Sequence, residues 1–233
     1  MKKIGIIIFA VALVIGLVVS NIFSFGHAAH GLFHFSFDFS GEKGSGKIVT
    51  EKRDLKGFKG VEVGGVFHVE ITAGKDFEVE IETDDNLLPL IKTEVDGDVL
   101  EIESEGRISP SGKIIVRISA PDINELDVSG AANVSLNGLK NSGLAVDSSG
   151  ASKVKIAGET AKLTAETSGA SKIDAEDLRV VDASIDGSGA SHVEINVSGE
   201  LTADLSGASK VVYSGTPSAV HKKTSGAGSV SQK

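Results

Sequence analysis

The sequence predicts an all-β fold, and three observations support this. Glycine is abundant, with 28 of 233 residues, whereas aromatic residues are only 5%, so the core must be built from small and branched aliphatic side chains between frequent turns. Apolar and polar residues alternate in short runs between residues 48 and 120. From Ser129 onward, a Ser-Gly-Ala triplet returns at nearly constant intervals. Such a period indicates stacked structural units.

The first segment, residues 1–28, predicts export. Lys2 and Lys3 precede an apolar run over residues 4–19, which is the layout of a secretory signal. The segment is also long enough to remain as a membrane anchor, at about 1.5 Å of helix per residue. Gly26-His27-Ala28 is a possible cleavage site, so signal peptide and anchor both stay open. In either case the rest of the chain is expected in the periplasm, at the cell surface, or anchored and facing outward.

Residues 29–47 are predicted to form a Phe-rich strand and a Gly/Ser-rich linker. Phe33, Phe35, Phe37 and Phe39 alternate with polar residues, so one face of the strand is aromatic. This face is expected to cover an open end of the following domain or to rest in a membrane interface. The stretch from Gly41 to Lys47 resembles a phosphate-binding loop only superficially, because Ile48 stands where Ser or Thr is required.

Residues 48–120 are predicted to be an N-terminal part of longer β-strands. The alternating runs cover residues 61–63, 66–72, 77–82, 99–103 and 113–119, and they are separated by Gly- and Asp-rich breaks. Residues 84–92 alone could form a helical turn, which Pro89 keeps short. The glutamates within the runs are therefore expected on solvent-facing positions.

Residues 121–233 contain six repeats. The triplets start at intervals of 18 to 20 residues, and the first two residues of each are expected to form a structural corner, where glycine permits positive φ or close approach. These corner residues are Ser129, Gly130, Ser149, Gly150, Ser168, Gly169, Ser188, Gly189, Ser206, Gly207, Ser225 and Gly226. A unit of about 19 residues at about 3.3 Å per residue has a perimeter near 60 Å, which suits one coil of a parallel β-helix.

Three columns of apolar residues become visible when the repeats are aligned on the triplet serine. The column five residues after the serine is β-branched throughout, and those three and five residues before it are aliphatic. All three are predicted to face the core. Their members are Val134, Val154, Ile173, Val193, Val211 and Val230; Leu126, Val146, Ala165, Ile185 and Ala203; and Leu144, Leu163, Ala183, Leu201 and Val220.

Two charged columns are candidate ligand-binding rows. Stacked coils would place neighbouring members of one column about 4.8 Å apart, so the acids form one row and the mostly basic residues another. The acidic row is Asp127, Asp147, Glu166, Asp186 and Asp204. The other row contains Lys153, Lys172 and Lys210, together with Asn133 and His192. The acids need counter-charges, which the basic row, solvent or a bound cation could supply.

Composition excludes several classes of function. The formal charge of −9 argues against a nucleic-acid partner, and the absence of cysteine excludes disulfides, thiolate catalysis and Cys-ligated zinc. No set of histidines and carboxylates has the spacing of a metal or catalytic site, so no catalytic residue, metal or cofactor is expected.

The stretch over residues 58–103, followed by PDINELDVSGAANV and recurrent SGAS, resembles the putative auto-transporter adhesin, head GIN domain family. The resemblance covers about residues 52–230. It implies a right-handed, single-stranded parallel β-helix in the envelope or at the cell surface, with an adhesin-like role. Export is expected to use the N-terminal segment.

The leading functional hypothesis is a non-enzymatic exported module that binds a glycan or a protein partner along a flank of the β-helix. A polysaccharide-cleaving lyase or hydrolase is an alternative, because β-helices also carry clustered carboxylates. The acids recur in like settings, which argues against this alternative, since catalysis needs carboxylates in unlike environments. An envelope scaffold or sensor is a further alternative if the N-terminal segment stays in the membrane.

Overall fold

The structure is a computed structural model, and it describes residues 41–233. The predicted export segment, residues 1–28, and most of the Phe-rich segment lie outside the described residues. The described part belongs to one compact unit made of strands, with a single 3-10 turn at Leu88–Leu90. The all-β prediction is confirmed. Within this part of the chain, no helix is long and apolar enough to cross a membrane.

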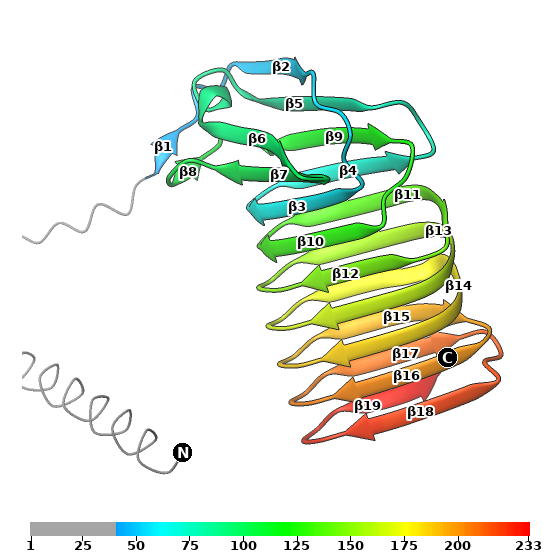
Figure 1. The fold of residues 1–233 in the computed structure, drawn as a ribbon. Helices are drawn as coiled ribbons and strands as arrows, with labels where there is room; N and C mark the ends of the chain where they lie inside the picture. The colour runs from blue at the N-terminus through cyan, green and yellow to red at the C-terminus, as the bar shows by residue number, and fades with distance from the viewer. Residues whose placement is uncertain (1–40) are drawn as a thin grey trace, which may run out of the picture. The chain divides into compact units, whose positions relative to one another are not determined.

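Nine strands form the N-terminal part, and five of them, β3, β4, β5, β7 and β9, lie at the positions of the five alternating runs, whereas β1, β2, β6 and β8 were not among those runs (Figure 1). They are β1 (Glu42–Lys43), β2 (Ile48–Arg53), β3 (Gly60–Gly65), β4 (His68–Ala73), β5 (Glu78–Asp84), β6 (Ile91–Asp96), β7 (Val99–Ser104), β8 (Ile108–Ser109) and β9 (Ile115–Ala120). The 3-10 turn lies between β5 and β6 and contains Pro89. The helical turn expected in residues 84–92 is thus one short turn.

The large sheet is mixed, and this corrects the expectation of a wholly parallel fold. β2 pairs antiparallel with β5, β5 with β9, and β6 with β7. The β6–β7 pair is a hairpin, because Asp96 opposes Val99 and only Gly97 and Asp98 stand between them. Gly97 has φ +61°, which suits such a tight loop. A loop this short can join antiparallel strands only, since parallel neighbours need a longer crossover.

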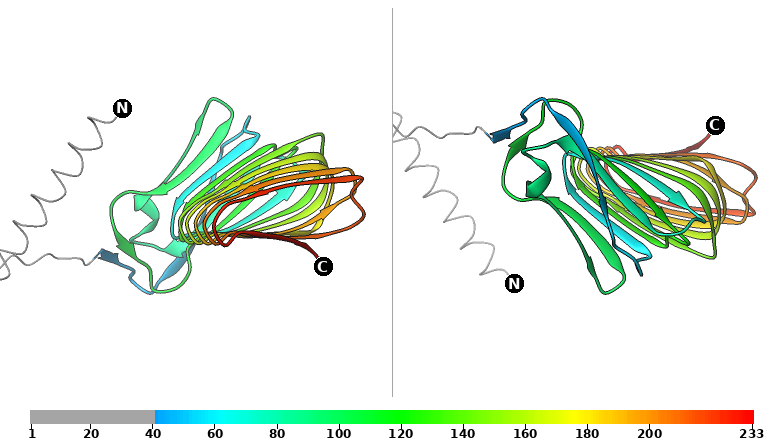
Figure 2. Two further views of the ribbon diagram at one scale, coloured as in Figure 1. Left: turned by 90° about the horizontal axis from the view of Figure 1, so that it is seen from below. Right: turned by 90° about the horizontal axis from the view of Figure 1, so that it is seen from above.

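Ten strands form the repeat part, and they pair in parallel with one another at a distance of about one repeat along the chain (Figure 1). The first two, β10 and β11, also pair in parallel with β3 and β4 of the N-terminal part. They are β10 (Glu125–Gly130), β11 (Asn133–Asn141), β12 (Leu144–Ser148), β13 (Lys153–Thr167), β14 (Lys172–Gly187), β15 (His192–Val197), β16 (Glu200–Leu205), β17 (Lys210–Ser214), β18 (Ala219–Thr224) and β19 (Ser229–Gln232). Viewed from below and from above, successive turns of the chain superimpose in a flattened outline (Figure 2).

The pairs build two parallel ladders. One runs through β7, β3, β10, β12, the ends of β13 and β14, β16 and β18. The other runs through β9, β4, β11, the starts of β13 and β14, β15, β17 and β19. Both ladders therefore begin in the N-terminal part and continue without interruption into the repeats.

One hydrophobic core joins the two parts. Every member of the three apolar columns is buried, except Val220 and Val230 in the last coil, which are partly buried. The same cluster contains N-terminal side chains such as Phe58, Ile71 and Leu100. Full burial of one such side chain is worth about 1.5–3 kcal/mol, so each coil stabilises its neighbours through several of them.

The Gly/Ser-rich segment before Ile48 is tied to this body and is not a free linker. β1 pairs with β8, and the Ser45 amide donates to Asn86 Oδ1 at 2.8 Å. The amide of Gly46 donates to Asp84 Oδ1 at 2.7 Å. Asp84 is buried and also accepts hydrogen bonds from the amide and hydroxyl of Ser111. These bonds place the sharply turned backbone of this segment against the strands.

Candidate functional site

The six triplet glycines stack on one another at one corner of the coils. Their φ angles lie between +69° and +83°, in the left-handed region that favours glycine. Close approach is a second reason for glycine, because a Cβ on Gly169 would lie 2.5 Å from the Gly150 carbonyl oxygen. The following alanine amide donates to the glycine carbonyl of the preceding coil, as Ala170 does to Gly150 at 2.7 Å. The triplet therefore forms the turn and links consecutive coils.

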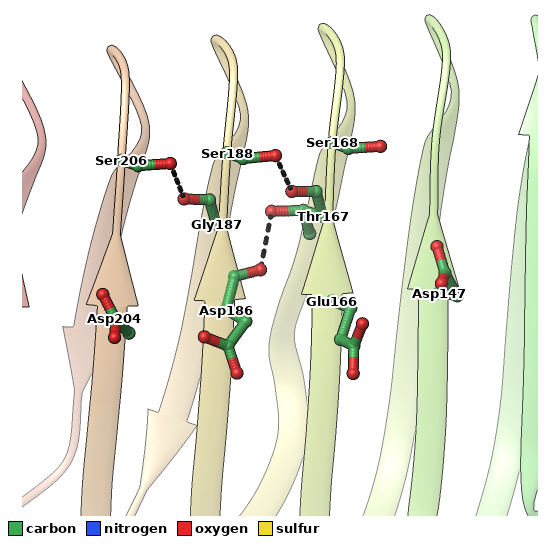
Figure 3. Close-up of a pocket in the computed structure, with 9 residues that line it drawn as sticks. All are labelled: Asp147, Glu166, Thr167, Ser168, Asp186, Gly187, Ser188, Asp204 and Ser206. Atoms are coloured by element: carbon green, nitrogen blue, oxygen red, sulfur yellow. Dashed lines mark hydrogen bonds between the residues drawn. The ribbon is translucent and has the colours of Figure 1, made fainter. Parts of the chain in front are cut away.

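The predicted acidic residues form one in-register row just before this corner. Asp127 pairs with Asp147, Asp147 with Glu166, Glu166 with Asp186, and Asp186 with Asp204. Figure 3 shows the last four on successive strands of one ladder, with their carboxylates on the same face. Neighbouring strands lie about 4.8 Å apart, so the charges are closely spaced along the stack.

The row extends beyond the repeats, which the sequence analysis did not anticipate. Glu62 on β3 pairs with Asp127, and Glu101 on β7 pairs with Glu62. The missed signal was the stretch Val61-Glu62-Val63-Gly64-Gly65, which matches Leu126-Asp127-Val128-Ser129-Gly130 in pattern but lacks the triplet. We call the seven residues Glu101, Glu62, Asp127, Asp147, Glu166, Asp186 and Asp204 the carboxylate row.

The carboxylate row has little counter-charge of its own. Lys223 bonds to Asp204 at one end, and the other six carboxylates form no ion pair with any described residue. Each neighbouring pair repels by about 0.9 kcal/mol in water. Burial raises the pKa of Asp127, with smaller contributions from Asp147 and Glu125. Burial likewise raises the pKa of Glu62, followed by the charge of Asp127.

The triplet serines line the carboxylate row on the side of the corner. Ser188 Oγ donates to the Thr167 carbonyl at 3.4 Å, and Ser206 Oγ to the Gly187 carbonyl at 3.5 Å (Figure 3). Each hydroxyl keeps lone pairs available to a ligand. Carboxylates and hydroxyls together line an open recess of about 260 Å³. Its lining residues are Asp147, Glu166, Thr167, Ser168, Asp186, Gly187, Ser188, Asp204 and Ser206.

The predicted basic row also stacks in register, but on the other side of the corner. Lys153 pairs with Lys172, Lys172 with His192, and His192 with Lys210. None of them lines the recess, and in the described part of the chain no ion pair connects them to the carboxylate row. Lys172 and His192 instead contact Glu194 at 3.1 and 2.9 Å. The hydrogen bond from His192 and then that from Lys172 lower the pKa of Glu194.

A buried ladder of hydroxyls lies behind the corner and was not predicted. It comprises Ser148, Ser152, Thr167, Ser171, Ser191 and Ser209. Ser148 bonds to Ser152 at 2.7 Å, and Ser191 joins Thr167 at 2.8 Å and Ser209 at 3.1 Å. The signal was present in the recurrent SGAS, whose second serine follows the corner and points inward.

The carboxylate row does not converge on a single point. Among residues 41–233, one group of acidic side chains has ligand atoms within 4.8 Å of one another, namely Asp174, Glu176 and Glu194. This group lies outside the recess, and Glu176 and Glu194 are engaged by Lys233, Lys172 and His192. The row itself is thus arranged as a line of separate charges.

A sequence comparison identifies the family. The sequence model of the family described as putative auto-transporter adhesin, head GIN domain, matches residues 57–217. The chain belongs to this family. The match covers both ladders except their last strands, β18 and β19, and it covers all but one of the six triplets. This head GIN domain therefore includes the carboxylate row and the recess.

Two solved structures share the fold of this head GIN domain. One is a putative adhesin from Bacteroides fragilis, with a TM-score of 0.69 and 22% identity over 83% of this chain and 100% of that one. The other is a putative adhesin from Parabacteroides distasonis, with a TM-score of 0.52 and 22% identity over 82% of this chain and 99% of that one. No curated protein matches the chain.

Proposed function

We propose that this head GIN domain is an exported adhesin-like module that binds an extended glycan along the carboxylate row. The supporting observation is the combination of a straight line of carboxylates with a parallel line of serine hydroxyls at one flank. The family name and the two adhesin-like folds support a surface role. The export segment predicted for residues 1–28 supports an outward-facing location.

The architecture suits an extended ligand. We interpret the two ladders as a right-handed parallel β-helix with coils of about 19 residues, closed at its N-terminal end by the antiparallel strands. Equivalent side chains on such a stack repeat about every 4.8 Å along one line. A polymer lying along this line would meet the same pair of groups, one carboxylate and one hydroxyl, in each coil.

The charge of the row indicates the kind of glycan. Six carboxylates that form no ion pair within residues 41–233 favour a ligand that carries positive charge at intervals. A single chelated divalent ion fits poorly, because the carboxylates are spread along the stack and do not surround one point. The serine row favours a sugar over a basic peptide, since sugar hydroxyls can donate to and accept from serine. The best match is therefore an amino-sugar polymer such as a glucosamine oligomer.

The module is proposed to bind without cleaving. A glycosidase needs one carboxylic acid and one carboxylate in different surroundings. The four acids of the recess occupy equivalent positions of successive coils on one face. No two of these four acids differ in their surroundings in the way that a general acid and a nucleophile or base would require.

Calorimetric titration of residues 41–233 with glucosamine oligomers tests this function. The triple variant Asp147→Asn, Glu166→Gln, Asp186→Asn is expected to weaken binding at least tenfold, because it removes three charges from the recess. The control variant Asp174→Asn, Glu176→Gln, Asp177→Asn removes the same charge outside the recess and should bind as wild type. Fully N-acetylated oligomers should bind more weakly than glucosamine oligomers. Equal weakening by both triple variants, or release of cleaved sugar, would contradict the proposal.

A further inference from the structure

The C-terminal coil differs from the coils that precede it. In the first ladder Leu201 pairs with Val220, but Ala203 pairs with Lys222 and Leu205 with Thr224. In the second ladder Val211 pairs with Val230, but Tyr213 pairs with Gln232. Partners in a parallel ladder point to the same side, so three core positions become polar in the last coil. These three polar residues are Lys222, Thr224 and Gln232.

Lys222 lies across the end of the core. Its backbone belongs to β18, and its Nζ donates to the carbonyl of Val230 on β19 at 3.1 Å. The same Nζ lies 5.9 Å from the centre of the Tyr213 ring, which favours a cation over the ring face. Gln232 Nε2 donates to the Gly215 carbonyl at 3.1 Å. The side chain of Lys222 therefore spans from one ladder to the other, over the last aromatic residue of the core.

The outer edges of this coil are unpaired and basic. Within residues 41–233, β18 pairs with β16 alone and β19 with β17 alone, so each has one edge with free backbone groups. An open edge invites another strand, and lysine on such an edge opposes this. The two strands contain His221, Lys222 and Lys223 and no acidic residue, although the whole chain has a formal charge of −9.

We propose that the last coil is a cap that prevents a second copy of this chain from adding to the C-terminal end of the stack. Lys222 is the central residue of the cap, because it replaces an apolar core position and places a charge over the end of the core. Terminal repeats of stacked proteins need such a polar surface to stay soluble. Two C-terminal ends that approached each other would also bring lysines together on both edges.

The test restores the apolar pattern at the end of the stack. Residues 41–233 with Lys222→Val and Gln232→Val should form dimers or larger species as concentration rises, measured by light scattering after gel filtration. Wild type should remain a monomer over the same range. The control Lys153→Val, Lys210→Val removes two positive charges from the flank, and it should also remain monomeric. A monomeric Lys222→Val, Gln232→Val variant, or a wild type that associates through this end, would overturn the proposal.

The position of the contact can be tested because the chain has no cysteine. Ser231→Cys places one exposed thiol on β19. Mild oxidation should cross-link this residue rapidly when Lys222 and Gln232 are valine, and at least tenfold more slowly when both are native. Association without faster cross-linking would place the contact elsewhere and would also overturn the proposal. If the double valine variant does not fold, Lys222→Ala alone should also associate and cross-link faster than wild type, since alanine occupies this column at Ala203.

Discussion

The N-terminal strands and the repeats both carry acidic residues on their outer faces. The two regions differ in whether a basic side chain of the fold forms ion pairs with these acids. In the N-terminal part, Arg117 on β9 contacts Glu70, Glu80 and Glu82 at 3.6, 3.1 and 2.9 Å. The hydrogen bond that Arg117 donates to Glu82 is the largest cause of the raised pKa of Arg117. In the repeats, Asp147, Glu166 and Asp186 stand in line and form no ion pair with any residue of 41–233. Arg117 and Glu70 belong to the second ladder, whereas the carboxylate row belongs to the first, so the fold neutralises its acids unequally. The uncompensated row is the surface that we propose for a cationic ligand.

The two regions also differ in how their turns constrain the chain. Gly46, before β2, has φ +82° and open space where a Cβ would be. Gly169, in the repeats, has φ +72° and the Gly150 carbonyl oxygen against that space. Gly46 is required by its backbone conformation alone. Gly169 is required by its backbone conformation and also because the neighbouring coil lies too close to leave room for a Cβ. This difference predicts unequal tolerance of alanine.

The largest expected effect is at the repeat corner. Gly169→Ala should lower the free energy of unfolding by about 3 kcal/mol or more, because the left-handed conformation costs about 1–2 kcal/mol and the methyl group must also push two coils apart. Gly46→Ala should cost only the first part, about 1–2 kcal/mol. Urea unfolding of both variants measures the difference. Equal losses would mean that the coils can separate freely at this corner.

A smaller effect is expected at the buried carboxylate of the N-terminal part. Asp84→Asn should cost about 1–3 kcal/mol, because the carboxylate accepts bonds from Gly46 and Ser111. The hydroxyl of Ser111 is the main cause that lowers the pKa of Asp84. A lowered pKa means that the ionised Asp84 contributes its full share to the free energy of unfolding at neutral pH. This contribution is lost as pH falls through the lowered value. Melting temperatures of wild type and variant should therefore converge in acid, and a constant gap would contradict this.

The smallest effect, of opposite sign, is expected in the carboxylate row. Asp127→Asn should raise stability by a few tenths of a kcal/mol at neutral pH, because the ionised side chain is half-buried beside Asp147. The raised pKa means that the cost of ionisation develops as pH rises from the ordinary pKa of aspartate to the raised value, and that acidification below this window relieves it. Asp204→Asn loses the bond to Lys223 and should not stabilise. If both variants shift the melting temperature alike, the row is not electrostatically strained.

Much of the repeat part could be predicted from sequence because its period fixes which residues share a column. The burial of Val154 and Ile173 and the alignment of Asp147 with Glu166 follow from spacing alone. The pairing of the N-terminal strands could not be predicted, since alternation reveals a strand but not its partner. Glu62 was missed because its stretch lacks the triplet. The hydrogen bond from Ser111 to Asp84 could not be predicted either, because it joins residues 27 apart in the chain.

The candidate site shows the same division. The two charged columns and the serine column were visible in the aligned repeats, and the structure places four of the acids and three of the triplet serines around one recess. The separation of the lysine row from that recess depends on the corner, because Lys153 and Lys172 follow the turn while the acids precede it. The sequence shows that the triplet lies between the two rows, but spacing does not reveal whether the turn brings the lysines close enough to pair with the acids.

The most direct test of the proposed function is a map of ligand contacts by backbone amide chemical shifts, on labelled residues 41–233 titrated with glucosamine oligomers. The account predicts saturable shifts along the line of Ser149, Ser168, Ser188 and Ser206 and in the acids beside them, with little change at Lys153 and Lys210. Shifts concentrated on the lysine row, or an absence of shifts at oligomer concentrations that saturate binding in calorimetry, would contradict it.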